Sequence, residues 1–134
     1  MKIEYVAFEN PALQEEVANL IGRHRHVIPP WILRVRVVMC ANREDSLGAM
    51  ARATLDHDYM SLTLEVYARW IDQSDEKREE TIKHEIVHSI TNYQFNLAMD
   101  VVNKLIPDES MKAFIKGQMT ERVERTTCWL TEIL

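Results

Sequence analysis

Hydrophobic side chains recur every three to four residues in two long stretches, 11–24 and 75–106, and this spacing gives a helix one apolar face. The recurring positions are Leu13, Val17, Leu20 and Ile21, then Ile82, Ile86, Ile90, Tyr93, Leu97, Val101, Val102 and Leu105. Ser74 precedes the second stretch and is a favourable N-cap, with acidic side chains in the turns that follow. Pro107 ends this helical stretch, and a final helix is predicted from Ser110 to near the C-terminus.

Apolar and polar residues alternate in three shorter stretches, 31–38, 51–55 and 61–67, which predicts β-strands. A polar connection at 42–47 separates the first two strands, and the turn-forming residues 56–58 separate the last two. The last two strands are therefore expected to pair as a hairpin. The strand at 61–67 comes directly before the second helical stretch. We expect it at the edge of the sheet, where an extended peptide could pair with it.

The order of these elements is a helix, a small sheet of about three strands, a long helix and C-terminal helices, which predicts an α+β fold. The length of 134 residues favours a single domain covering residues 1–134, and no Gly/Ser-rich linker or internal repeat divides it. A hydrophobic content of 46% and a charged content of 28% are normal for a soluble globular protein. Such a chain can bury a core of its own without disulfides.

Charge and cysteine content narrow the expected partners and location. A formal net charge of -5 argues against nucleic acid as the main partner. No stretch approaches the ~20 apolar residues of a membrane span, and the N-terminus lacks the apolar run of a signal peptide. The expected location is therefore the cytoplasm, without a membrane partner. Cys40 and Cys128 form no CxxC pair, and each is expected to be a buried free thiol.

The second long helix carries an HExxH sequence, formed by His84, Glu85 and His88. Two histidines four residues apart project from the same face of a helix, so their ring nitrogens can bind one metal ion. Zn²⁺ suits this position because it accepts imidazole and carboxylate ligands, and catalytic sites have three protein ligands plus water. Glu85 is placed to act on that water as a general base. A chance match on an exposed charged helix is the alternative, and the well-specified helix argues against it.

Two histidines leave a catalytic zinc site one protein ligand short. No histidine follows His88, so a carboxylate from the final helix is the remaining reasonable donor. That helix offers Glu121 and Glu124. Each could instead be a solvent-exposed side chain paired with Arg122 or Arg125.

An HExxH helix followed by a glutamate on a later helix resembles the gluzincin branch of the zincin metallopeptidases. In that branch the ligand glutamate is often followed three residues later by a small residue and then by an apolar one. Glu124 fits this pattern with Thr127 and Leu130, whereas Glu121 fits it less well. The small size and the strands before the motif helix are similar to minimal zincin-like proteins of bacteriophages and bacteria. The resemblance covers residues 50–134.

The sequence also departs from the longer gluzincins. An aspartate or asparagine often follows the ligand glutamate by four residues in those proteins. Here Arg125 follows Glu121 and Cys128 follows Glu124 at that distance. The residue that orients the ligand glutamate and its neighbours is therefore not evident from the sequence.

The resemblance implies zinc-dependent hydrolysis of a peptide or protein substrate. It implies that His84, His88 and Glu124, or alternatively Glu121, bind Zn²⁺, and that Glu85 is the general base for the metal-activated water. The alternative function is a binding or regulatory module that keeps the zincin fold without proteolysis, with structural zinc or none. Metal-dependent hydrolysis of another kind of substrate is a third possibility. Substrate specificity and oligomeric state are not indicated by the sequence.

Overall fold

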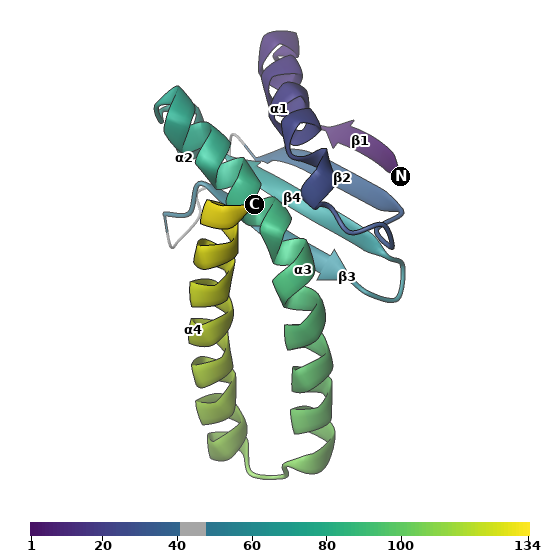
Figure 1. Cartoon of the computed structure of the whole chain (residues 1–134), viewed down its shortest axis with the longest axis vertical. Helices are drawn as coiled ribbons and strands as arrows, with labels where there is room; N and C mark the ends of the chain where they lie inside the picture. The colour runs from purple at the N-terminus through teal and green to yellow at the C-terminus, as the bar shows by residue number, and fades with distance from the viewer. Residues whose placement is uncertain (41–47) are drawn as a thin grey trace.

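In the computed structural model of the chain, which describes residues 1–40 and 48–134, four strands form one sheet in the order β1-β2-β4-β3 (Figure 1). The strands are β1 (Lys2–Val6), β2 (Arg34–Cys40), β3 (Ala51–Asp56) and β4 (Ser61–Tyr67). β1 and β4 both pair parallel with β2, whereas β3 pairs antiparallel with β4. The expected β3–β4 hairpin is therefore confirmed. The predicted polar connection at 42–47 lies outside the described residues.

The sheet corrects two predictions made from the sequence. It has a fourth strand, β1, whose residues KIEYV are mostly half-buried and lack a clear alternation of buried and exposed positions. The strand at 61–67 was expected at the edge and is central, because β2 pairs with it on the side opposite β3. The parallel β2–β4 pairing joins segments with no tight turn between them, so local sequence does not specify it. The strands at the two edges are β1 and β3.

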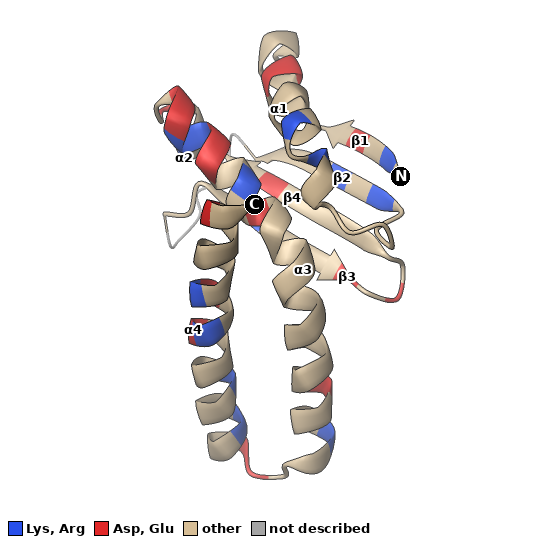
Figure 2. Cartoon of the chain, viewed as in Figure 1, with Lys and Arg blue, Asp and Glu red and all other residues tan. Residues whose placement is uncertain are grey.

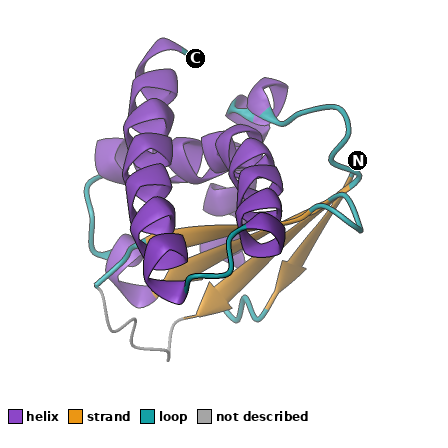
Figure 3. Cartoon of the chain, turned by 90° about the horizontal axis from the view of Figure 1, so that it is seen from below, coloured by secondary structure: helices purple, strands orange, loops and turns teal. Residues whose placement is uncertain are grey.

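In the described residues, four α-helices and one short 3-10 helix, η1 (Arg25–Val27), accompany the sheet. The α-helices are α1 (Pro11–Arg23), the short α2 (Ala68–Ile71), α3 (Asp75–Leu105) and α4 (Glu109–Ile133). The α+β class is confirmed, and the motif helix continues through 95–106 as one 31-residue helix. The Ser74 side chain caps α3 by accepting a hydrogen bond from the Lys77 amide, as the sequence predicted. Figure 3 shows the two long helices on one side of the sheet. None of the helices in the described part of the chain combines the length and apolar character that a membrane span needs.

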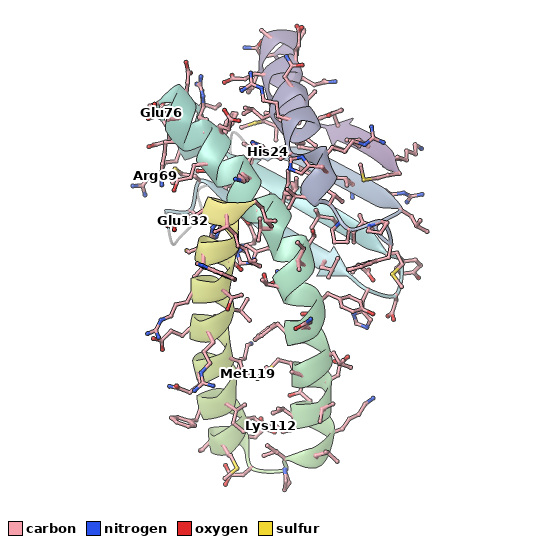
Figure 4. The ribbon with its side chains drawn as sticks, viewed as in Figure 1. His24, Arg69, Glu76, Lys112, Met119 and Glu132 are labelled. Carbon is pink, nitrogen blue, oxygen red and sulfur yellow. The ribbon has the colours of Figure 1, made fainter. Side chains whose placement is uncertain are left out.

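The C-terminal end of α1 is joined to α3 by a polar contact. The His24 side chain places its Nε2 atom 3.0 Å from Oε1 of Glu79, and Nη1 of Arg23 lies 3.0 Å from the other carboxylate oxygen (Figure 4). Both partners of Glu79 come from the end of α1, so this carboxylate fixes where α1 meets α3. His24 is thereby engaged in a structural contact.

The apolar face of α3 is covered by the sheet only along its first half. Ile82 and Ile86 are buried against the core, whereas Leu97, Val101 and Leu105 on the same stripe are 63%, 47% and 74% exposed. Figure 1 shows the reason: α3 and α4 extend beyond the sheet as a long antiparallel hairpin. Residues 92–126 include no buried residue. Helical spacing predicts an apolar face, but it does not determine how far a sheet extends beneath it.

Tyr93 lies where the covered part of α3 ends. It is 40% exposed, and its ring is 5.7 Å from that of Trp31, centroid to centroid. Tyr93 therefore packs at the margin of the sheet and not in the core as its place in the stripe predicts. Acidic and basic residues both occur along α4, which is one arm of the α3–α4 hairpin (Figure 2).

The two halves of α3 should respond differently to the same kind of substitution. We expect Ile82→Ala to lower the free energy of unfolding by about 2–5 kcal/mol, because it removes a fully buried side chain. Leu97→Ala should change it by no more than about 0.5 kcal/mol, because Leu97 is largely exposed. Urea denaturation of both variants measures the difference. Equal destabilisation by the two substitutions would contradict this account of the helix.

Candidate metal centre

The two histidines of the HExxH sequence and one glutamate of the last helix converge where α4 crosses α3. His84 and His88 lie one turn apart, with ring centroids separated by 4.8 Å and ring planes at 85°. Oε1 of Glu124 lies 3.0 Å from Nε2 of His84, and Oε2 lies 3.4 Å from Nε2 of His88. Each carboxylate oxygen of Glu124 is thus directed at a different histidine.

Glu121, the other predicted candidate, takes no part in this cluster. Its carboxylate forms an ion pair with Arg125, one turn further along α4. Glu121 lies only about 60° from Glu124 around the helix, and its pairing with Arg125 is what keeps its carboxylate out of the cluster. The packing of α4 on α3 therefore selects Glu124.

Two buried threonines contact the other ring nitrogen of His88. Thr91 Oγ1 and Thr127 Oγ1 each lie 3.4 Å from Nδ1 of His88, and the two hydroxyl oxygens are 2.8 Å apart. Thr127 donates to the Val123 carbonyl at 2.8 Å, so its own hydrogen is already used. Thr91 must then donate to Thr127, and no hydroxyl hydrogen remains for His88.

This hydrogen-bond arrangement favours one tautomer of His88, whose ring also hydrogen-bonds the side chain of Asn92. Because both hydroxyl oxygens accept at Nδ1, the proton of the neutral ring sits on Nδ1, and Nε2 keeps a free lone pair. Burial and the neighbouring His84 lower the pKa of His88, which favours the neutral ring. The nitrogen that faces Glu124 is therefore the one able to bind a metal.

The donor atoms also have separations that suit zinc. Tetrahedral ligand atoms bound at about 2.0–2.1 Å are about 3.4 Å from one another. Oε1 of Glu124 lies 3.0 Å from Nε2 of His84 and Oε2 lies 3.4 Å from Nε2 of His88, so each histidine has a carboxylate oxygen at about this separation. Two imidazoles and one carboxylate form a donor set typical of catalytic zinc, so the residues fit this metal.

Glu85 lies beside the cluster and is held against the sheet. Its side chain accepts a hydrogen bond from the backbone of Ala53 on β3. Burial raises the pKa of Glu85 to about 8, the negative charge of Glu124 also raises it, and Arg52 opposes the rise. A cation bound by the neighbouring histidines would favour the ionised carboxylate and lower this pKa. The Glu85, His84 and His88 donor atoms lie within 4.8 Å of one another, which places Glu85 within reach of a group at the cluster.

Cys128 also lies at the cluster, although the sequence predicted a buried thiol. The side chain is exposed, and its donor atom lies within 4.8 Å of those of His84 and Glu124. Partial burial and the carboxylates of Glu124 and Glu132 raise the pKa of Cys128; Figure 4 labels Glu132 one turn beyond it. The four-residue spacing from Glu124 is the sequence signal that places Cys128 on the same side of α4.

Comparisons with known proteins identify no relative of this chain: no protein-family model, no curated protein and no solved structure matches it. The interpretation of the cluster therefore depends on its own side chains and their arrangement.

Removing the hydroxyl of Thr127 should weaken metal binding without removing a ligand. We expect Thr127→Val to lower zinc affinity about 10–100-fold, because Nδ1 of His88 loses an acceptor that fixes its tautomer and orientation. Zinc affinity is measured by competition with a chromogenic chelator. Thr127→Ser keeps the hydroxyl and should bind zinc like the parent chain. If Val and Ser at this position bind zinc equally well, Thr127 does not position His88.

Proposed function

We propose that this protein is a zinc-dependent metallopeptidase of the gluzincin type. His84, His88 and Glu124 hold the metal, and Glu85 is the general base. The observation that carries the proposal is the placement of the two Glu124 carboxylate oxygens, 3.0 and 3.4 Å from the Nε2 atoms of two histidines one helical turn apart. The proton on Nδ1 of His88 supports it, because the ring then offers Nε2 as a ligand.

The residues around the centre each have a defined task in peptide hydrolysis. Bound Zn²⁺ supplies Lewis acidity, which lowers the pKa of water to about 7 and polarises the peptide carbonyl. Glu85 takes the proton of the attacking water and transfers it to the leaving amine nitrogen. The hydrogen bond from the Ala53 backbone lowers the pKa of Glu85 and so favours the ionised carboxylate, the form that accepts a proton.

The edge strand β3 supports a peptide as the substrate. β3 is the edge strand beside α3, and its residue Ala53 contacts the general base Glu85. A substrate in extended conformation can pair with an edge strand through backbone hydrogen bonds, and on β3 it would have to avoid Leu55, whose carbonyl accepts from Nδ2 of Asn96 on α3 at 3.5 Å. Such pairing would bring a peptide bond close to Glu85. This assigns to β3 the role that the sequence had suggested for the strand at 61–67.

Metal removal tests the proposal. The purified chain should contain about one zinc per molecule and cleave members of a mixed peptide library, with products identified by mass spectrometry. Treatment with 1,10-phenanthroline should abolish cleavage, and added Zn²⁺ should restore it. Bound zinc without any cleavage would favour the alternative, a non-proteolytic binding or regulatory module with structural zinc. A chain that binds no zinc would contradict the metal centre itself.

A further inference from the structure

One side chain at the centre has no task in the mechanism above. Cys128 lies one turn after Glu124 on α4, and the cysteine, glutamate and His84 donor atoms are within 4.8 Å of one another. Cys128 is exposed, so the thiol is accessible from solvent. The other cysteine, Cys40, lies on β2 and belongs to no such group of donors in the described part of the chain.

The distances allow the sulfur to reach a metal shared with the other donors. With zinc–sulfur bonds of about 2.3 Å and zinc–nitrogen bonds of about 2.0–2.1 Å, tetrahedral sulfur and nitrogen ligands are about 3.5 Å apart. The donor atoms of Cys128, His84 and Glu124 are separated by at most 4.8 Å. The sulfur therefore needs to approach by no more than about 1.3 Å, and rotation about χ1 of an exposed cysteine moves it by at least this much.

We propose that Cys128 is a fourth protein ligand of the metal held by His84, His88 and Glu124. The proposal rests on the proposed metal centre and adds a residue to it. When the ligand forms, the sulfur–hydrogen bond breaks, the proton passes to solvent and the sulfur lone pair binds the metal. Thiolate is among the strongest zinc ligands that proteins offer.

A fourth protein ligand changes the kind of site that the centre forms. Zinc with four protein ligands is closed, whereas hydrolysis requires one position open to water and substrate. Cys128 and water therefore compete for one position, and the thiolate has to leave before a peptide can react. With a metal bound, Cys128 would close the site, and its release would open the site to water and substrate.

Cobalt substitution tests this ligand directly, because Co²⁺ takes zinc-like geometry and reports its ligands in the absorption spectrum. The full chain loaded with Co²⁺ should show visible bands of a tetrahedral ion and an intense near-ultraviolet band from thiolate-to-cobalt charge transfer. Cys128→Ser should lose the charge-transfer band and keep the visible bands. The matched control, Cys40→Ser, should keep both. Cys128 is exposed, so its replacement removes no core packing.

The possible results separate the cysteine ligand from the metal centre. Visible bands without a charge-transfer band in the parent chain would overturn the role of Cys128 and leave the His84, His88 and Glu124 centre intact. A charge-transfer band that persists in Cys128→Ser would also overturn it. If Co²⁺ does not bind to the parent chain at all, both the fourth ligand and the proposed metal centre are wrong.

Discussion

Replacing Glu85 with glutamine is expected to reduce peptide hydrolysis about 10²- to 10⁴-fold while zinc remains bound. Glutamine has nearly the same shape, but its amide cannot accept the proton of the attacking water. The proposed zinc ligands His84, His88 and Glu124 are unchanged in this variant. Steady-state cleavage of a fluorogenic peptide, together with the zinc content of the purified protein, measures both effects.

Glu121→Gln is the matched control for the Glu85 experiment. It makes the same chemical change on a nearby helix, at a carboxylate that pairs with Arg125 instead of facing the histidines. Its hydrolysis rate should equal that of the parent chain. Normal cleavage by the Glu85 variant would rule out this residue as the general base. Loss of zinc from the Glu85 variant would show instead that Glu85 is needed for zinc binding.

Replacing Glu124 with alanine is expected to lower zinc affinity by more than about 100-fold, because removing only an outer-shell partner already costs about 10–100-fold. Glu124 is the one carboxylate of α4 that contacts both His84 and His88. Its exposed position means that truncation removes little packing. Isothermal titration with Zn²⁺ measures the loss, and circular dichroism monitors whether the helices remain.

Glu121→Ala distinguishes the two candidates for the third ligand. The residue lies on the same helix, but its carboxylate contacts Arg125, so we expect unchanged zinc affinity. If the Glu121 variant loses zinc and the Glu124 variant keeps it, the observed packing of α4 on α3 is not the arrangement that binds metal. Equal losses in both variants would point to disruption of α4 as a whole.

Local sequence was sufficient to predict the elements that carry the centre. The polar cap Ser74 and the stripe from Ile82 to Ile90 predict the helix on which His84, Glu85 and His88 lie. The strands β3 and β4 were predicted at 51–55 and 61–67 because a short turn joins them and apolar and polar residues alternate along them. The spacing at which apolar side chains recur in a helix or a strand depends only on neighbouring residues. It can therefore be recognised without knowing the rest of the fold.

Long-range pairing was not predictable in the same way. The parallel contacts of β2 with β1 and β4 depend on segments far apart in the sequence, and they move the strand at 61–67 from the edge to the centre. Half-burial also concealed β1, because its pattern has no clear alternation. The exposed positions of Leu97 and Val101 follow from the length of the sheet, which no residue on α3 encodes.

The sequence by itself determined the HExxH helix, the α+β order of elements and a choice between two glutamates. The tertiary structure decided that Glu124 faces the histidines, that Thr91 and Thr127 fix the proton of His88, and that Cys128 lies beside them. The physical reason is the range of the interactions. Spacing along one helix places side chains on a common face, but only the packing of α4 across α3 brings Glu124 into contact with the two histidines.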